Sequence, residues 1–170
     1  LEVTSHGLYQ KRVMGIDFDM AVMTNITHEH MDYHKSWEEY RNVKAELFVG
    51  THFAVLNKDD KSFDFMKSKL KKGTKILTYS LKDSKADIFA HKIKFSDEGT
   101  KLGISYKNKN YQSQINLLGH YNISNYLGAL GVGVGLEFNI EDLIKSLSSF
   151  KTLRGRLENI SNKKGIDIYI

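Results

Sequence analysis

Histidine and carboxylate side chains crowd one short stretch of the sequence, where His28, Glu29, His30, Asp32 and His34 follow a probable strand. Imidazole and carboxylate groups bind Mg²⁺, Mn²⁺ or Zn²⁺ in proteins. One loop seldom supplies a complete metal site, and this spacing is equally typical of a solvated polar loop. The residue types therefore predict ion chemistry here only if other segments contribute ligands.

A lysine stands where an apolar side chain is expected. In residues 37–49, a helical repeat of 100° per residue places Lys44 near the centre of an apolar stripe. The stripe consists of Trp37, Tyr40, Val43, Leu47 and Phe48. The other charged side chains of this helix fall on the opposite face. Lys44 therefore either packs its aliphatic part on the core and places its ammonium group in solvent, or it is a buried amine with a chemical function.

The elements that must position these residues follow from periodicity and caps. Residues 18–24 are expected to be a buried strand, and residues 53–57 and 75–79 two further strands, with helices over 37–49 and 62–70 between them. Ser36 and Glu39 predict a capping box at the start of the first helix. Strand-helix-strand alternation indicates a parallel sheet. Ligand sites of such sheets lie at the carboxyl ends of the strands, which is where the residue 25–35 loop begins.

The pattern changes between residues 87 and 117. Three alternating strands are separated by Asp97-Glu98-Gly99 and Asn108-Lys109-Asn110, which are hairpin signals. Two helices are expected next, over 122–136 and 140–148. The predicted fold class is thus α/β, a parallel sheet with flanking helices and a small inserted antiparallel sheet.

Composition narrows the class of protein. The chain has 170 residues, no cysteine and a formal charge of +5. It has the size of one globular domain, and thiolate metal sites and disulfides are excluded. No long apolar run or leader is visible, so the expected location is cytoplasmic. The lysines between 58 and 109 alternate with polar residues and indicate a solvated surface; a basic nucleic-acid-binding module is the weaker alternative.

Both ends of the sequence suggest further chain. The first residues, LEVTSHGL, are strand-like, and the last, GIDIYI, form an apolar strand with no cap or tail. No GxxxxGK[ST] phosphate-binding loop occurs in the sequence. We expect missing sequence on each side.

Six short segments together resemble the Mur ligase family, in the family's order and spacing. They are EVTSHGLYQKR at 2–12, TNITHEHMDYH at 24–34, Lys44, NKDD at 57–60, LLGHYNISN at 117–125 and GRLE at 155–158. The first segment is most similar to Mur ligases that add the third residue of the stem peptide. Thr4 and Glu29 depart mildly from the family's usual Ser and Asp.

The resemblance implies roles for individual residues. Glu2 is similar to the carboxylate that holds the Mg²⁺ bridging the ATP phosphates, and His30 to the ligand of a second Mg²⁺. Lys44 matches a lysine that carries a carbamate. Carbon dioxide reacts only with a neutral amine, which desolvation on an apolar face favours.

Five more residues match binding positions of the family. Thr4 and Arg12 resemble contacts to the UDP-muramyl dipeptide, with a strand-end Thr and a surface Arg as the plain alternatives. Asn122 and Asn125 resemble the pair near the adenine, although Asn122 could simply cap its helix. Arg156 resembles an arginine that reaches ATP at the domain junction. Asn57 and Asp60 are assigned only to a strand-to-helix turn.

The resemblance implies a partial ATP-binding central domain over residues 1–152 and the start of a C-terminal ligase domain over 153–170. The expected activity is ATP- and Mg²⁺-dependent addition of a diamino acid to UDP-MurNAc-L-Ala-D-Glu through an acyl phosphate, by a monomer with no nucleic-acid or membrane partner. The fragment alone is expected to be inactive. Alternatives are a D-Ala-D-Ala-adding ligase, a folylpolyglutamate synthetase, and a zinc protein built on His28, His30 and His34.

Overall fold

The computed structural model describes residues 1–27 and 34–150. Its strands are β1 (Met20–Met23), β2 (Phe53–Asn57), β3 (Lys75–Ser80), β4 (Ile88–Ser96), β5 (Gly99–Tyr106) and β6 (Lys109–Ile115). Its helices are α1 (Ser5–Tyr9), α2 (Trp37–Ala45), α3 (Phe63–Lys69), α4 (His120–Gly135) and α5 (Ile140–Ser148), with a 3₁₀ turn, η1, at Glu46–Phe48. The predicted succession of elements from β1 to α5 is confirmed.

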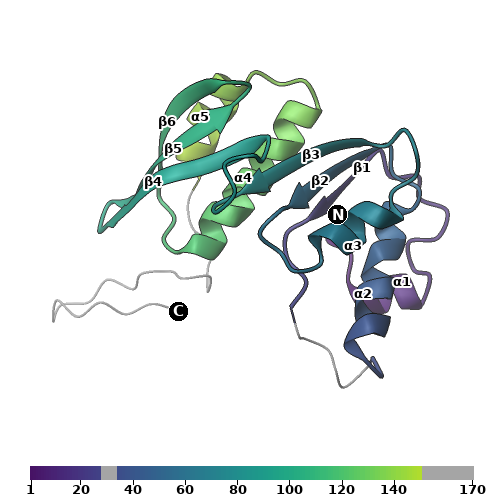
Figure 1. The fold of residues 1–170 in the computed structure, drawn as a ribbon. Helices are drawn as coiled ribbons and strands as arrows, with labels where there is room; N and C mark the ends of the chain where they lie inside the picture. The colour runs from purple at the N-terminus through teal and green to yellow at the C-terminus, as the bar shows by residue number, and fades with distance from the viewer. Residues whose placement is uncertain (28–33, 151–170) are drawn as a thin grey trace, which may run out of the picture.

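All six strands belong to one sheet in the order β1-β2-β3-β4-β5-β6 (Figure 1). Strands β1 to β4 pair in parallel, and β4, β5 and β6 pair antiparallel. The α/β class is therefore confirmed. The antiparallel strands extend the parallel sheet directly, because β4 pairs with β3 through Tyr79 and Ser80 before it pairs with β5.

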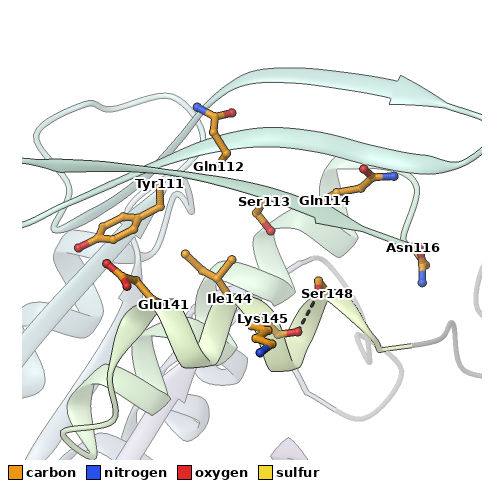
Figure 2. A pocket seen from close by; sticks show the side chains of 9 residues that line it. All are labelled: Tyr111, Gln112, Ser113, Gln114, Asn116, Glu141, Ile144, Lys145 and Ser148. Carbon is orange, nitrogen blue, oxygen red and sulfur yellow. Dashed lines mark hydrogen bonds between the residues drawn. The ribbon is translucent and has the colours of Figure 1, made fainter.

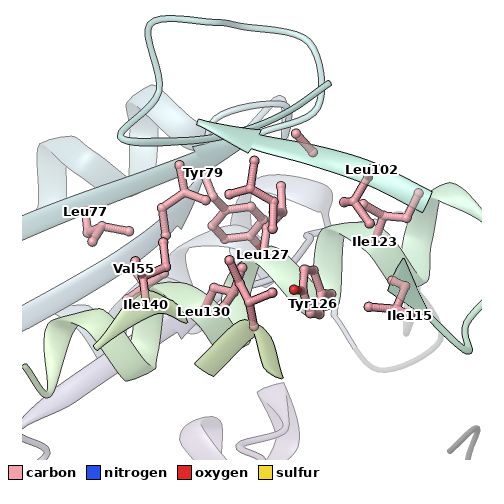
Figure 3. Close-up of a cluster of buried hydrophobic side chains, with 14 residues drawn as sticks. Val55, Leu77, Tyr79, Leu102, Ile115, Ile123, Tyr126, Leu127, Leu130 and Ile140 are labelled. Atoms are coloured by element: carbon pink, nitrogen blue, oxygen red, sulfur yellow. The ribbon is translucent and has the colours of Figure 1, made fainter. Parts of the chain in front are cut away.

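Helices cover both faces of the sheet. Side chains alternate between faces along a strand, so Val55 of β2 points to α4 while its neighbours Ala54 and Leu56 point to α2 and α3. The larger cluster of buried side chains joins β2–β6 to α4 and α5 (Figure 3). Gly131 lets α4 approach closely, since a Cβ there would lie 2.6 Å from Val55 Cγ1.

The amino-terminal segment differs from its prediction. The expectation of a strand over residues 1–8 is wrong for the last four of them, which lie in α1 (Ser5–Tyr9). Thr4 is the N-cap, and its side chain accepts a hydrogen bond from the backbone N–H of Gly7 at 3.1 Å. The cap satisfies a backbone donor that a strand would have needed to pair elsewhere, which is why the β-favouring residues before it do not extend into a strand.

The start of α2 agrees better with its prediction. Ser36 Oγ accepts from Glu39 N at 3.1 Å, so the predicted cap is confirmed. The Glu39 carboxylate accepts from Lys35 N at 2.7 Å, one residue earlier than an ideal capping box. The α-helix ends at Ala45, and η1 completes the predicted segment.

Candidate active site at the carboxyl edge of the sheet

A cavity of about 830 Å³ lies beside β1 and extends past its carboxyl end. Its walls come from the segment before α1, from β1 and the residues after it, from α2 with η1, and from α4. Four predicted site residues line it: Glu2, Thr4, Lys44 and Asn125. The fold thus collects side chains from four distant parts of the sequence at the place where open α/β sheets bind ligands.

Lys44 reaches this cavity from α2. The apolar stripe is largely buried as predicted, with Tyr40, Val43 and Phe48 inside, while Lys44 is half-buried. Its Nζ donates to the backbone carbonyl of Val3 at 3.2 Å. The amine therefore lies at the seam between α2 and the segment that carries Glu2 and Thr4.

Glu2 and Thr4 are exposed residues of the cavity wall. Thr4 also caps α1, so the strand-end alternative for this residue is wrong and its hydroxyl has a structural task as well as a place in the cavity. Glu2 precedes the helix and lines the same cavity as Lys44.

The two asparagines of α4 have different surroundings. Asn125 lines the cavity and is exposed. Asn122 lies outside the cavity lining, and its Nδ2 donates to the carbonyl of Leu118 at 2.8 Å. The helix starts at His120 after Gly119, which has a φ of 88°, so Asn122 is not the N-cap. The capping alternative is wrong, and an adenine contact from Asn122 stays a prediction.

The remaining predicted residues lie elsewhere. Arg12 is exposed and is not part of the cavity wall. His30 and Arg156, as well as His28 of the zinc alternative, fall outside the described residues. His34 is only 2% exposed, with ring centroids of Tyr40 and His6 at 5.3 and 6.0 Å. No group of three or more His, Cys, Asp or Glu side chains within residues 1–27 and 34–150 could hold a metal ion.

Behind the cavity lies a set of polar groups that the sequence assigned only to a turn. Asn57 Nδ2 donates to the carbonyl of Thr24 at 2.7 Å, and Asp60 Oδ2 accepts from Ile26 N at 2.8 Å. The hydroxyl of Tyr79 donates to Met23 O at 3.0 Å. The sequence contained a signal for this set, because Asn57 ends β2 and Asp60 lies in the turn that follows it.

Burial raises the pKa of Tyr79. Desolvation raises the pKa of its hydroxyl far above the usual tyrosine range, and the carboxylates of Asp60 and Asp59 raise it further. A hydrogen bond with Ser124 opposes this rise. The hydroxyl is therefore neutral at physiological pH and remains a donor to the backbone at the end of β1.

A second cavity, of about 500 Å³, is lined by residues of β6 and α5 (Figure 2). Tyr111, Ser113, Glu141 and Lys145 are among the residues that line it. None of the predicted site residues that the structure describes is in its lining. In the described part of the chain, no helix is long and apolar enough to span a membrane.

Comparison with known proteins identifies the family of this chain. The family model of the Mur ligase middle domain matches residues 1–133. A UDP-N-acetylmuramyl-tripeptide synthetase 2 of Oceanobacillus iheyensis is 35% identical in an alignment that covers 100% of this chain and 36% of the relative. A UDP-N-acetylmuramoyl-L-alanyl-D-glutamate–2,6-diaminopimelate ligase of Pseudomonas syringae pv. tomato is 35% identical over 94% of this chain and 33% of its own length.

Solved structures lead to the same family. A UDP-N-acetylmuramoyl-L-alanyl-D-glutamate–2,6-diaminopimelate ligase superposes with a TM-score of 0.88 at 32% identity, covering 96% of this chain and 34% of that one. MurF from Acinetobacter baumannii shares the fold, with a TM-score of 0.77 at 18% identity over 85% of this chain and 32% of its own. The chain spans about a third of the length of the curated relatives it matches. With the middle-domain match over residues 1–133, this chain belongs to the Mur ligase family.

Proposed function

We propose that this chain supplies most of the ATP-binding central domain of a ligase that joins a diamino acid to UDP-MurNAc-L-Ala-D-Glu. The observation that carries the proposal is the cavity at the carboxyl end of β1, where Glu2, Thr4, Lys44 and Asn125 meet. A relative named for joining 2,6-diaminopimelate to UDP-N-acetylmuramoyl-L-alanyl-D-glutamate matches along 94% of the chain, and one named as a UDP-N-acetylmuramyl-tripeptide synthetase matches along 100%, which supports the choice of substrate. On this proposal, residues 1–152 belong to the central domain and 153–170 begin the next one.

The donor set of the cavity fits a hard cation bound to a nucleotide. Glu2 offers an exposed carboxylate, and Mg²⁺ binds through one or two carboxylates together with substrate phosphates. Asn125 lines the same space and can pair with the adenine edge through its amide. When bound, Mg²⁺ would neutralise charge on the transferring phosphoryl group. His30, Arg156, Arg12 and Asn122 complete the proposed ligand and substrate contacts.

In the proposed reaction, the side-chain carboxylate of D-Glu attacks the γ-phosphorus of ATP, ADP leaves, and an acyl phosphate forms. The free amine of the diamino acid then attacks the acyl carbon, loses a proton and expels phosphate to give the amide. The residues of this chain hold the two reactants in line and exclude water from the acyl phosphate.

Lys44 has a specific task in this scheme. We propose that its amine carries a carbamate, which supplies an anionic oxygen ligand that lysine itself lacks. Carbon dioxide reacts with the neutral amine, and Lys44 lines the cavity from a half-buried position on α2. Val3 O, 3.2 Å from Nζ, would hold the remaining N–H.

The test is a substrate panel on the complete protein that carries this segment. ADP release is measured with ATP, Mg²⁺, bicarbonate and UDP-MurNAc-L-Ala-D-Glu plus either meso-diaminopimelate or L-lysine. Parallel assays offer the UDP-muramyl tripeptide with D-Ala-D-Ala, and a reduced folate with glutamate. Turnover only with a diamino acid supports the proposal. Turnover only in one of the parallel assays would overturn it and assign the protein to the ligase class of that assay.

Lys44→Met sharpens this test, because methionine keeps a similar stem volume. We expect a folded protein with no ligase activity and no carbamate signal in ¹³C NMR with labelled bicarbonate. An active Lys44→Met protein would remove the carbamate from the proposal. The isolated 170-residue chain should show no turnover.

A further inference from the structure

The residues at the end of β2 bind to the chain on both sides of that strand. Toward β1, Asn57 Nδ2 donates to Thr24 O at 2.7 Å and Asp60 Oδ2 accepts from Ile26 N at 2.8 Å. Toward β3, Asp59 Oδ2 accepts from Leu81 N at 2.6 Å, and its other oxygen bonds the Ser80 hydroxyl. Two adjacent carboxylates therefore hold two different loops.

Only one of these two loops lines the cavity. Thr24, Asn25 and Ile26 form part of the cavity wall, whereas Ser80 and Leu81 do not. After Met23 the chain leaves the strand, so Thr24–Ile26 have no sheet ladder to fix their backbone. Because backbone groups away from water need partners, the position of this wall depends on the side chains behind it.

The same network reaches the helix that carries Asn125. Asn57 Nδ2 lies 3.3 Å from the hydroxyl oxygen of Ser124, the residue before Asn125. The Tyr79 hydroxyl, which is fully buried, bonds Met23 O at 3.0 Å and contacts Thr24 O at 3.4 Å. Asn57 is itself 7% exposed, so these bonds form away from bulk water, where each contributes more than on the surface.

We infer that Asn57 and Asp60 are positioning residues of the ligase site, which set the Thr24–Ile26 wall of the cavity relative to α4. This inference rests on the proposed function and extends it to residues that touch no substrate. Hydrogen bonds that fix a loop also fix the groups that the loop presents to a ligand site, and small displacements of such groups lower the reaction rate. Asp60 also accepts from Ser62 N at 2.7 Å, so the start of α3 and the cavity wall share one carboxylate.

The neighbouring aspartate provides a matched control. Asp60→Asn and Asp59→Asn make the same change of charge and shape one residue apart. In Asp60→Asn, one of two backbone N–H groups, of Ile26 or Ser62, faces an amide NH₂ and loses its acceptor. In Asp59→Asn the loss falls on Leu81 or Ser80, beside β3.

The two variants are compared in the complete protein for kcat, melting temperature and hydrogen exchange at the Ile26 amide. We expect kcat to fall about tenfold or more in Asp60→Asn, as for outer-shell partners of functional groups, and to stay within about twofold in Asp59→Asn. Exchange at Ile26 should become faster only in Asp60→Asn. A merely structural role would lower both melting temperatures and leave kcat of the folded protein unchanged.

Equal kcat values in the two variants would overturn the inference, as would unchanged exchange at Ile26. If Asp60→Asn does not fold, Tyr79→Phe removes a single hydroxyl from the same network and carries the same expectation for kcat. An inactive wild-type protein would count against the proposed function instead, and the Ile26 exchange comparison would still decide whether Asp60 holds this wall.

Discussion

The two halves of the sheet divide their tasks. Around β1–β3 the strands are parallel, and polar side chains beyond their carboxyl ends bond the loops that enclose a cavity of about 830 Å³. Around β4–β6 the strands are antiparallel, and their inner face contributes Ile88, Leu102, Ile104 and Ile115 to the larger buried cluster. Parallel strands bring their carboxyl ends to one edge, which concentrates loops there, whereas hairpins alternate the ends of their strands.

Helix α4 belongs to both halves. Its buried side places Ile123, Leu127 and Leu130 in the larger cluster, while Asn125 faces the cavity. The comparison therefore predicts that stability and ligand chemistry can be changed separately by substitutions in different halves, except on this helix.

The largest expected effect is on stability. Ile104→Ala in β5 removes a fully buried side chain and should lower the free energy of unfolding by about 2–5 kcal/mol. The kcat of the folded protein should not change, because Ile104 lies outside the cavity lining. Denaturant unfolding and ligase assays below the transition test this together. A loss of kcat in the fully folded variant would break the division between the halves.

The next effect is on chemistry. Glu2→Gln should reduce ligase turnover about a hundredfold, near 3 kcal/mol, because a positioned charge is lost from the site. Stability should change by less than about 0.5 kcal/mol, since Glu2 is exposed. The control is Glu141→Gln, a carboxylate that lines the cavity between β6 and α5. Similar rate losses in both variants would show that turnover depends on the net charge of the protein and not on the position of the Glu2 carboxylate.

Two buried tyrosines give a closer comparison. Tyr79 bonds the end of β1, and the hydroxyl of Tyr126 lies 2.8 Å from that of Ser113 in β6. Each change to Phe should cost about 1 kcal/mol of stability through one lost hydrogen bond. Only Tyr79→Phe should also lower kcat. Equal kcat values for the two variants would argue against separate tasks for the halves.

The smallest effect is an electrostatic one. A hydrogen bond from Lys58, with Nζ 2.5 Å from Asp83 Oδ2, lowers the pKa of the Asp83 carboxyl below its usual value, and the Lys85 backbone N–H lowers it further. A carboxyl with a lowered pKa in the folded state stabilises the protein above the unfolded pKa and loses that contribution as pH falls through the folded one. Asp83→Asn should therefore lower the melting temperature slightly near neutral pH and not at about pH 2. A difference that persists in acid would exclude this ion pair as its cause.

Local pattern was sufficient for most of the fold. The boundaries of β2 and α5 agree with those predicted, and Ser36 caps α2 as expected, because periodicity and capping depend on neighbours in the sequence. The strand expectation failed at Ser5–Tyr9 because the N-cap at Thr4 outweighs strand propensity. The sequence also did not predict that the antiparallel strands join the parallel sheet, since this depends on the pairing of β3 with β4.

The sequence by itself determined the fold class, the buried face of α2 and the family, because periodicity and motifs are properties of residue types in order. Only the tertiary structure decided which candidates meet. It placed Glu2, Thr4, Lys44 and Asn125 around one cavity, left Arg12 and Asn122 outside its wall, and turned Asn57 and Asp60 toward the loop after β1. Contacts between residues far apart in the sequence, such as the hydrogen bond from the backbone N–H of Ile26 to the Asp60 carboxylate 34 residues later, depend on how strands pair, and spacing along the chain does not encode that pairing.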